Sequence, residues 1–149
     1  MQSPLCTIVY EKTTPHEVIA TLHAQAVGAL IDVRALPISR KPGFAKRALA
    51  QALGEAGIAY HPMPALGNPK PGRQAARRGD FQAFRRLYQA HLYGEAAQRA
   101  LLDLIRIASR ECACLMCFER DHAICHRTLI AEAVAARAAI TLQHLKVDL

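Results

Sequence analysis

Short apolar segments alternate along this chain with segments of helical periodicity, and this alternation restricts its fold more than any other feature. Five apolar runs predict strands, at residues 6–10, 29–33, 58–61, 112–118 and 140–145. In Ala29–Val33 the apolar residues are nearly consecutive, which is typical of a strand covered on both faces. Strands that alternate with helices favour right-handed crossovers. The expected fold is α/β: a three-layer, Rossmann-like domain with a mainly parallel, five-stranded sheet.

The helices between these strands carry start and stop signals. Thr14, Pro15 and Glu17 form a capping-box pattern with proline at the first helical position, and Gly28 is expected to end that helix. Periodicity predicts further helices that end at Gly57, begin after Asp80, and cover residues 95–109 and 126–137. Residues 62–79 hold four prolines and three glycines, and they predict a long irregular loop.

Length and composition favour one soluble domain over residues 1–149, with no membrane segment. The chain has 149 residues and no run of about 18 apolar ones, and residues 1–10 lack the pattern of a signal peptide. A cytoplasmic location is expected. The five cysteines are an odd number crowded mostly into one stretch, so reduced thiols are expected rather than a disulfide framework.

The positive charge is concentrated in the middle of the chain. The net charge is +7, and residues 34–86 contain eleven basic residues but two acids. This asymmetry favours an anionic partner, namely a nucleotide, a phosphorylated metabolite or a nucleic acid. The alternative is an arginine-rich surface that is simply solvated. Phe81, Phe84 and Tyr88 lie among these arginines, but their helical spacing predicts a buried face rather than stacking with bases.

Ionisable side chains collect where the predicted strands end. In an open parallel sheet, ligands bind beyond the carboxyl ends of the strands, near a switch in strand order. Acids, arginines, thiols and other polar groups fall at these ends or in the loops that follow: Tyr10, Asp32, Arg34, Ser39, Arg40, Asn68, Cys117 and Glu119. We therefore expect the functional site at this edge.

Cys125, His126 and Arg127 stand where the last predicted helix begins. A thiol near a helix N-terminus and beside basic groups is suited to act as a nucleophile, so Cys125 and Cys117 are both candidates, and the adjacent His126 is a further catalytic candidate. Glu119 or Asp32 is the candidate acid or base. Arg34, Arg40 and Arg127 suit the binding of phosphate or carboxylate, and Tyr10, Ser39 and Asn68 complete the candidate substrate site.

Several motifs, in order along the chain, resemble the domain of unknown function 488 family. They are Ala-Gly-Ile-x-Tyr at 56–60, Leu66-Gly67, and the sequences Asp32-Val33-Arg34, Pro37-x-Ser39-Arg40, Leu115-Met116-Cys117-x-Glu119 and Cys125-His126-Arg127. The resemblance implies the fold and the site but no established reaction. Relatives typically have Gly-His-Ser where this chain has Val9-Tyr10-Glu11, and a second glycine where it has Asn68. A catalytic role for that histidine in the relatives would make this chain a divergent or inactive version.

Four functions remain open at this point. The first is an enzyme that binds a nucleotide-like or phosphorylated ligand and uses a thiol, an acid and arginines. The second is a non-catalytic module that binds nucleotide or nucleic acid through the basic region. The third is thiol redox chemistry between Cys117 and Cys125. The fourth is a metal site, which is disfavoured because Cys112 and Cys114 should face one side of a strand and Cys117 the other. Neither a metal nor a cofactor is predicted, and a purely structural ion pair between Asp32 and an arginine is a further alternative.

Overall fold

The structure is a computed structural model that describes residues 4–36, 39, 41–117 and 126–147. Five strands form one sheet in the order β3-β2-β4-β1-β5, and every strand pairing within the described residues is parallel. This confirms the expected α/β fold with a five-stranded sheet. The strands are β1 (Leu5–Val9), β2 (Ala29–Asp32), β3 (Ala59–Pro62), β4 (Ala113–Cys117) and β5 (Leu142–His144).

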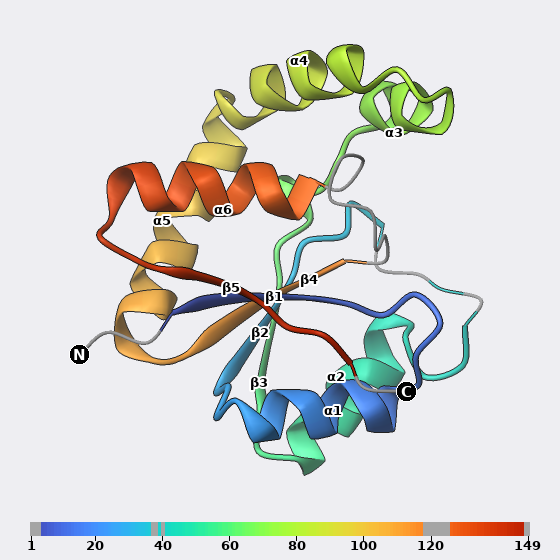
Figure 1. The fold of residues 1–149 in the computed structure, drawn as a ribbon, viewed down its shortest axis with the longest axis vertical. Helices are drawn as coiled ribbons and strands as arrows, with labels where there is room; N and C mark the ends of the chain where they lie inside the picture. Colours follow the sequence, from blue (N-terminus) through green and yellow to red (C-terminus); the bar gives the residue numbers. More distant parts are fainter. Residues whose placement is uncertain (1–3, 37–38, 40, 118–125, 148–149) are drawn as a thin grey trace.

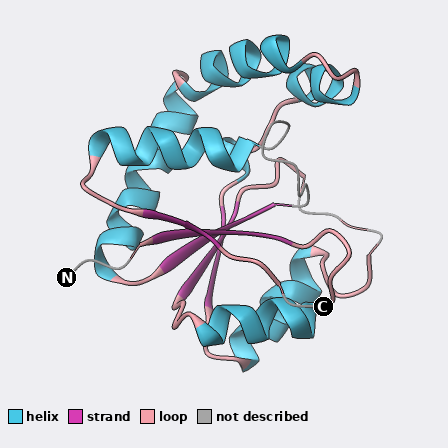
Figure 2. Cartoon of the chain, viewed as in Figure 1, coloured by secondary structure: helices cyan, strands magenta, loops and turns pink. Residues whose placement is uncertain are grey.

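Helices cover both faces of the sheet, which gives three layers (Figure 2). One face packs against α1 (Pro15–Ala24) and α2 (Lys46–Glu55), and its core includes Leu30 and Met116. The other face packs against α5 (Glu95–Arg110) and α6 (His126–Arg137), and its core includes Ile31 and Leu115. Because neighbouring residues of β2 and β4 point to opposite faces and both faces are covered, these strands are apolar except for Asp32 at the end of β2.

The strand order places a topological switch point at the carboxyl end of β4. The chain leaves β1 and β2 through helices on one face, α1 and α2, whereas it leaves β4 through α6 on the opposite face. β4 lies between β1 and β2 in the sheet, so the outgoing connections diverge on both sides of it. Such a divergence is the switch point at which α/β proteins bind ligands. Cys117 is the last residue of β4 and therefore marks this place.

The start of α1 follows the sequence pattern, but its end does not. Thr14 Oγ1 accepts from the Glu17 amide at 3.2 Å and Glu17 Oε1 accepts from the Thr14 amide at 2.8 Å, so the capping box is confirmed. The helix ends at Ala24 rather than Gly28, because Ala26 takes the left-handed conformation with φ 55°. The amides of Ala26 and Val27 then bond back to His23 and Leu22, which satisfies the last carbonyls.

The prediction of a long irregular loop at residues 62–79 is wrong, because most of this segment is helical. It contains a one-turn 3₁₀ helix, η1 (Pro64–Leu66), and α3 (Lys70–Arg77). The prolines at 69 and 71 do not interrupt α3, because they occupy its N-cap and first turn, where no backbone donor is needed. Gly79, with φ 76°, then turns the chain into α4 (Phe81–Leu92).

The α3–α4 pair stands at one end of the long axis of the molecule, and α1 and α2 stand at the other (Figure 1). Asp80 caps α4 as expected, by accepting from the Ala83 amide at 3.1 Å. Phe84 and Tyr88 are buried as expected, whereas Phe81 is 40% exposed and does not share their environment. Among the described residues, no helix has the length and apolar character needed to cross a membrane.

Candidate functional site

The carboxyl ends of β1, β2 and β4 lie side by side in the middle of the sheet and bring three of the expected residues to one edge. Val9 is in register with Cys117, and Asp32 with Met116. Tyr10, Asp32 and Cys117 are all buried. The sequence expectation that polar residues gather at this edge is thus matched for these residues.

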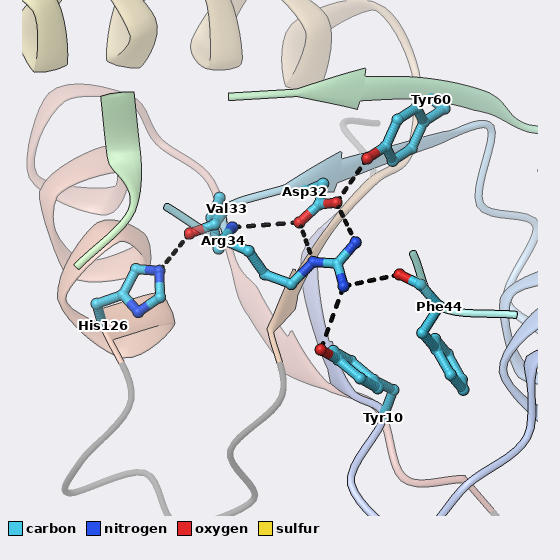
Figure 3. Close-up of polar contacts among 7 residues, drawn as sticks. All are labelled: Tyr10, Asp32, Val33, Arg34, Phe44, Tyr60 and His126. Carbon is cyan, nitrogen blue, oxygen red and sulfur yellow. Dashed lines mark hydrogen bonds and ion pairs between the residues drawn. The ribbon is translucent and has the colours of Figure 1, made fainter. Parts of the chain in front are cut away.

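Asp32 and Arg34 form a buried, bidentate ion pair (Figure 3). Arg34 Nε donates to Asp32 Oδ1 at 2.8 Å, and Nη2 donates to Oδ2 at 2.7 Å. The side chains are 6% and 0% exposed, respectively. Two parallel hydrogen bonds fix both the distance and the plane of the pair. This is the structural ion pair that the sequence left open as an alternative to catalysis.

The remaining contacts of Arg34 are also with the protein. Nη1 donates to the Phe44 carbonyl at 2.8 Å and to the Tyr10 hydroxyl at 3.2 Å, and the Tyr10 and Phe44 rings stack with centroids 4.4 Å apart. Burial alone would lower the pKa of Arg34, but the hydrogen bonds and charge of Asp32 outweigh it, and the pKa is raised. Only one of the five guanidinium N–H groups has no partner among these contacts. Arg34 is therefore mainly a scaffold for Tyr10 and the Phe44 loop.

Tyr60 completes the surroundings of Asp32, and the sequence did not single it out. Its hydroxyl donates to Asp32 Oδ2 at 2.6 Å (Figure 3). Burial, and then the neighbouring carboxylate, raise the pKa of Tyr60, so the hydroxyl keeps its proton at neutral pH. With the backbone amide of Arg34 at 3.2 Å, the Asp32 carboxylate accepts four hydrogen bonds. A carboxylate so well satisfied is suited to positioning its neighbours more than to moving a proton.

His126, at the start of α6, points into the core rather than toward an open site. Its Nε2 lies 2.5 Å from the Val33 carbonyl (Figure 3). Its ring also meets the Tyr88 ring edge-on, with centroids 5.4 Å apart. A carbonyl only accepts, so Nε2 carries the proton and donates it. Burial is the main cause that lowers the pKa of His126 to about 4, so the ring is neutral at pH 7. The side chain ties the start of α6 to the end of β2.

This environment predicts a pH-dependent stability that is specific to His126. The unfolded chain takes up a proton near pH 6.5 and the folded chain near 4, so the contribution is complete above pH 6.5 and is lost as pH falls toward 4. The free energy of unfolding should fall by about 3 kcal/mol over this window. We expect a His126→Gln variant, followed by denaturant titration at each pH, to lack this fall. A difference curve between wild type and variant that stays flat from pH 7 to 4 would contradict the assignment.

Cys117 and Arg127 meet at the switch point. Arg127 Nη1 donates to Cys117 Sγ at 3.5 Å, and each residue is 2% exposed. Arg127 stands in the first turn of α6, where the helix dipole adds positive potential. Cys117 is disulfide-bonded, whereas Cys6, Cys112 and Cys114 are free. The expectation of reduced thiols is therefore wrong for Cys117 and confirmed for the other three.

The Leu66-Gly67 motif packs against the loop that follows β2. A Cβ at Gly67 would lie 2.2 Å from Ala35 Cα and 2.3 Å from Ala35 N, so only glycine allows this approach of two backbones. Tyr88 of α4 stabilises this turn, because its hydroxyl donates to the Leu66 carbonyl at 2.6 Å. Asn68 is buried next to this contact. The motif thus places the start of α3 beside the carboxyl end of β2.

The other expected site residues are less informative. Ser39 Oγ accepts from the Lys41 amide at 3.1 Å, so it shapes its own loop. Arg40, Glu119 and Cys125 lie outside the described residues. The cysteines of β4 split between the two faces as expected, with Cys114 in one core and Cys117 in the other. In the described part of the chain, no group of three or more histidine, cysteine or acidic side chains is arranged to hold a metal ion.

Most of the chain, including the residues of the buried ion pair, matches one known protein family. The model of the family described as Domain of unknown function DUF488 matches residues 14–134. The chain belongs to the DUF488 family. No curated protein and no solved structure matches it. The DUF488 match includes Asp32, Arg34, Gly67, Cys117 and Arg127, so the buried ion pair and the switch-point contact both lie within the family region.

The structure also gives a physical role to one position at which this DUF488 chain departs from the relatives it resembles. Tyr10 precedes the matched residues 14–134 and is the position at which the resemblance leads us to expect the histidine of Gly-His-Ser. Its hydroxyl accepts from Arg34, and its ring lies under the guanidinium carbon at 5.3 Å from the ring centroid. Tyr10 is therefore built into the Arg34 scaffold.

Proposed function

We propose that this DUF488 protein is an enzyme that binds a nucleotide-like or phosphorylated anion at the carboxyl edge of its sheet and uses the Cys117 sulfur as a nucleophile. The observation that carries the proposal is the 3.5 Å contact between Arg127 Nη1 and Cys117 Sγ at the switch point. A guanidinium beside a cysteine favours the thiolate over the thiol, and the thiolate is the reactive species. An external dithiol reduces the Cys117 disulfide by thiol–disulfide exchange and becomes a disulfide itself, and the released Cys117 thiol then loses its proton to form the nucleophile.

The surroundings of Cys117 support an anionic ligand. Arg127 and the N-terminal turn of α6 bring positive potential to the switch point of the sheet, where α/β proteins bind ligands. Guanidinium groups bind phosphate oxygens through paired hydrogen bonds. His126 contributes by fixing the start of α6 to Val33, which holds Arg127 in place. Arg127 is thus the proposed anion-binding residue.

The buried Asp32–Arg34 pair has a positioning role in this proposal. Its contacts with Tyr10, Phe44 and Tyr60 join the ends of β1 and β2 to β3 and to the loop before α2. Asp32 already accepts four hydrogen bonds, so proton transfer is assigned to Glu119 as the remaining sequence candidate. These contacts would keep the carboxyl edge of the sheet rigid, and so hold a bound anion at a fixed distance and orientation from the Cys117 sulfur.

The pH dependence of Cys117 alkylation tests the proposed nucleophile. In the reduced protein, iodoacetamide should label Cys117 with a half-maximal rate well below about pH 8.5, the ordinary value for a thiol. Arg127→Met should move this midpoint upward by about one unit or more, because the favourable charge is lost. Half-exposed Cys112 in the same molecule is the internal reference, read by peptide mass spectrometry. A wild-type midpoint at or above pH 8.5 would sink the proposal.

Reversible thiol redox chemistry is the second candidate, and the disulfide at Cys117 favours it. In this function Cys117 and a second cysteine would exchange electrons with a partner dithiol. Peptide mapping without reductant, after equilibration in glutathione buffers of increasing potential, identifies the second cysteine and the midpoint. A midpoint between about −300 and −180 mV favours redox cycling, whereas a bond that stays closed throughout favours a structural disulfide.

A further inference from the structure

The hairpin formed by α3 and α4 is rich in positive charge. Residues 70–92 contain six lysines and arginines and one acid, Asp80. Four arginines of the hairpin are exposed: Arg77, Arg78, Arg85 and Arg86. No ion pair found among the described residues involves any of them. Asp80 uses a carboxylate oxygen to cap α4, so it forms no salt bridge with these arginines within the same part of the chain.

The hairpin also exposes one aromatic ring among these charges. Phe81 begins α4 and is 40% exposed, although Phe84 and Tyr88 on the same helix are buried. Arg85 follows Phe81 by four residues, so the two side chains are neighbours on the helix surface. Arg78 precedes the ring across the Gly79 turn. An aromatic surface bordered by guanidinium groups is the arrangement that stacks bases and holds the phosphates between them.

We propose that the α3–α4 hairpin, defined by Arg77, Arg78, Phe81, Arg85 and Arg86, binds single-stranded nucleic acid. Guanidinium groups match phosphate geometry, and an exposed ring provides a platform on which any base can stack. A membrane surface fits less well, since helices that bind in a membrane interface need a broad exposed apolar face. The apolar face of α4 instead packs in the protein core through Ala83, Phe84 and Tyr88.

The exposed arginines and Phe81 of the hairpin are different residues from those of the Cys117 site, although Tyr88 on the buried face of α4 contacts the His126 ring at 5.4 Å. The hairpin projects from the end of the molecule opposite α1 and α2 (Figure 1). The turn at Gly79 is fixed by the Asp80 amide, which donates to the Ala75 carbonyl at 2.9 Å, so the arginines on its two sides keep a defined spacing. Binding here goes beyond the proposed thiol chemistry and does not depend on it.

Fluorescence anisotropy with a labelled single-stranded oligonucleotide of about 15 nucleotides, as DNA and as RNA, tests this surface. The double variant Arg85→Ala/Arg86→Ala should weaken binding about tenfold at low salt and reduce the slope of log affinity against log salt by about 1.4. Phe81→Ala should weaken binding at least about 5-fold and leave the salt slope unchanged. DNA and RNA arms that differ show which sugar the surface prefers, and binding of either supports the proposal.

The matched control removes the same charge from the other end of the molecule. Lys46 and Arg47 are exposed at the start of α2, so Lys46→Ala/Arg47→Ala changes the net charge equally. We expect this variant to bind within about threefold of wild type, and Cys117→Ser to bind like wild type. The proposal is overturned if the control loses as much affinity as the α4 variant, if Phe81→Ala has no effect, if a duplex of equal length binds more tightly, or if no oligonucleotide binds at about 50 mM salt.

Discussion

Replacing Arg34 by methionine is expected to lower the free energy of unfolding by about 3–5 kcal/mol. The change leaves the Asp32 carboxylate, whose side chain is fully buried, with the Tyr60 hydroxyl and one backbone amide but no compensating charge. It also removes the donors that hold the Phe44 carbonyl and the Tyr10 hydroxyl. Urea denaturation followed by circular dichroism measures the loss.

A surface pair provides the control for this prediction. Arg106 and Asp103 lie 3.5 Å apart with side chains that are 70% and 61% exposed, so Arg106→Met removes an ion pair that water already screens. We expect its effect to stay below about 1 kcal/mol. Similar losses from Arg34→Met and Arg106→Met would mean that the buried pair does not organise the strand edge.

A Gly67→Ala variant is expected to lose about 3 kcal/mol of stability or more. The new Cβ would overlap the backbone of Ala35, which cannot rotate away as a side chain would, so the loop after β2 and the turn before α3 must separate. Gly54→Ala in α2 is the matched control, because no atom lies within 4 Å of its added Cβ. Gly54 lies in the last turn of α2 without a positive φ, so this second change should stabilise the protein, by at most about 0.5–1 kcal/mol.

Thermal and urea unfolding of the two glycine variants decide the point. We expect the free energy of unfolding to fall in Gly67→Ala and to rise in Gly54→Ala, although the chemical change is the same. If Gly67→Ala proves neutral, the close approach of the two loops is not a constraint, and the Leu66-Gly67 motif needs another explanation.

Most of the fold could be predicted from local sequence because its signals are local. The capping box at Thr14 and the consecutive apolar residues of β2 and β4 need only a few neighbouring residues to be recognised. Strand order could not be predicted, since the insertion of β4 between β1 and β2 depends on contacts between distant segments. The proline-rich segment misled the prediction because proline favours loops in general but is tolerated in the first turn of a helix, where α3 uses it.

The position of Asp32 and Cys117 at one edge of the sheet could be predicted, whereas the contacts of these side chains could not. Parallel strands bring their carboxyl ends together whatever the side chains do, so Asp32 and Cys117 could be placed at one edge. The sequence could not show whether Asp32 faces a ligand or Arg34. The two residues are separated by one position at the end of a strand, and this spacing permits either arrangement. Nor could the sequence show that His126 points to Val33. Tyr60 belongs to the Ala-Gly-Ile-x-Tyr motif, which was the only sequence signal for it. Its hydrogen bond to Asp32 depends on the pairing of β2 with β3, which the sequence does not show.

The central claim is that the switch point at β4 binds an anion through Arg127. Thermal unfolding of the reduced protein with mononucleotides and inorganic phosphate tests this most directly, with Arg127→Ala compared with Arg110→Ala, an exposed arginine at the end of α5. At a ligand concentration about 100 times its Kd, the account predicts stabilisation of about 2.7 kcal/mol in wild type and Arg110→Ala. It predicts none in Arg127→Ala, and an Arg85→Ala/Arg86→Ala variant should respond like wild type. Equal stabilisation of Arg127→Ala and wild type, or no response of the wild type to any of these anions, would contradict it.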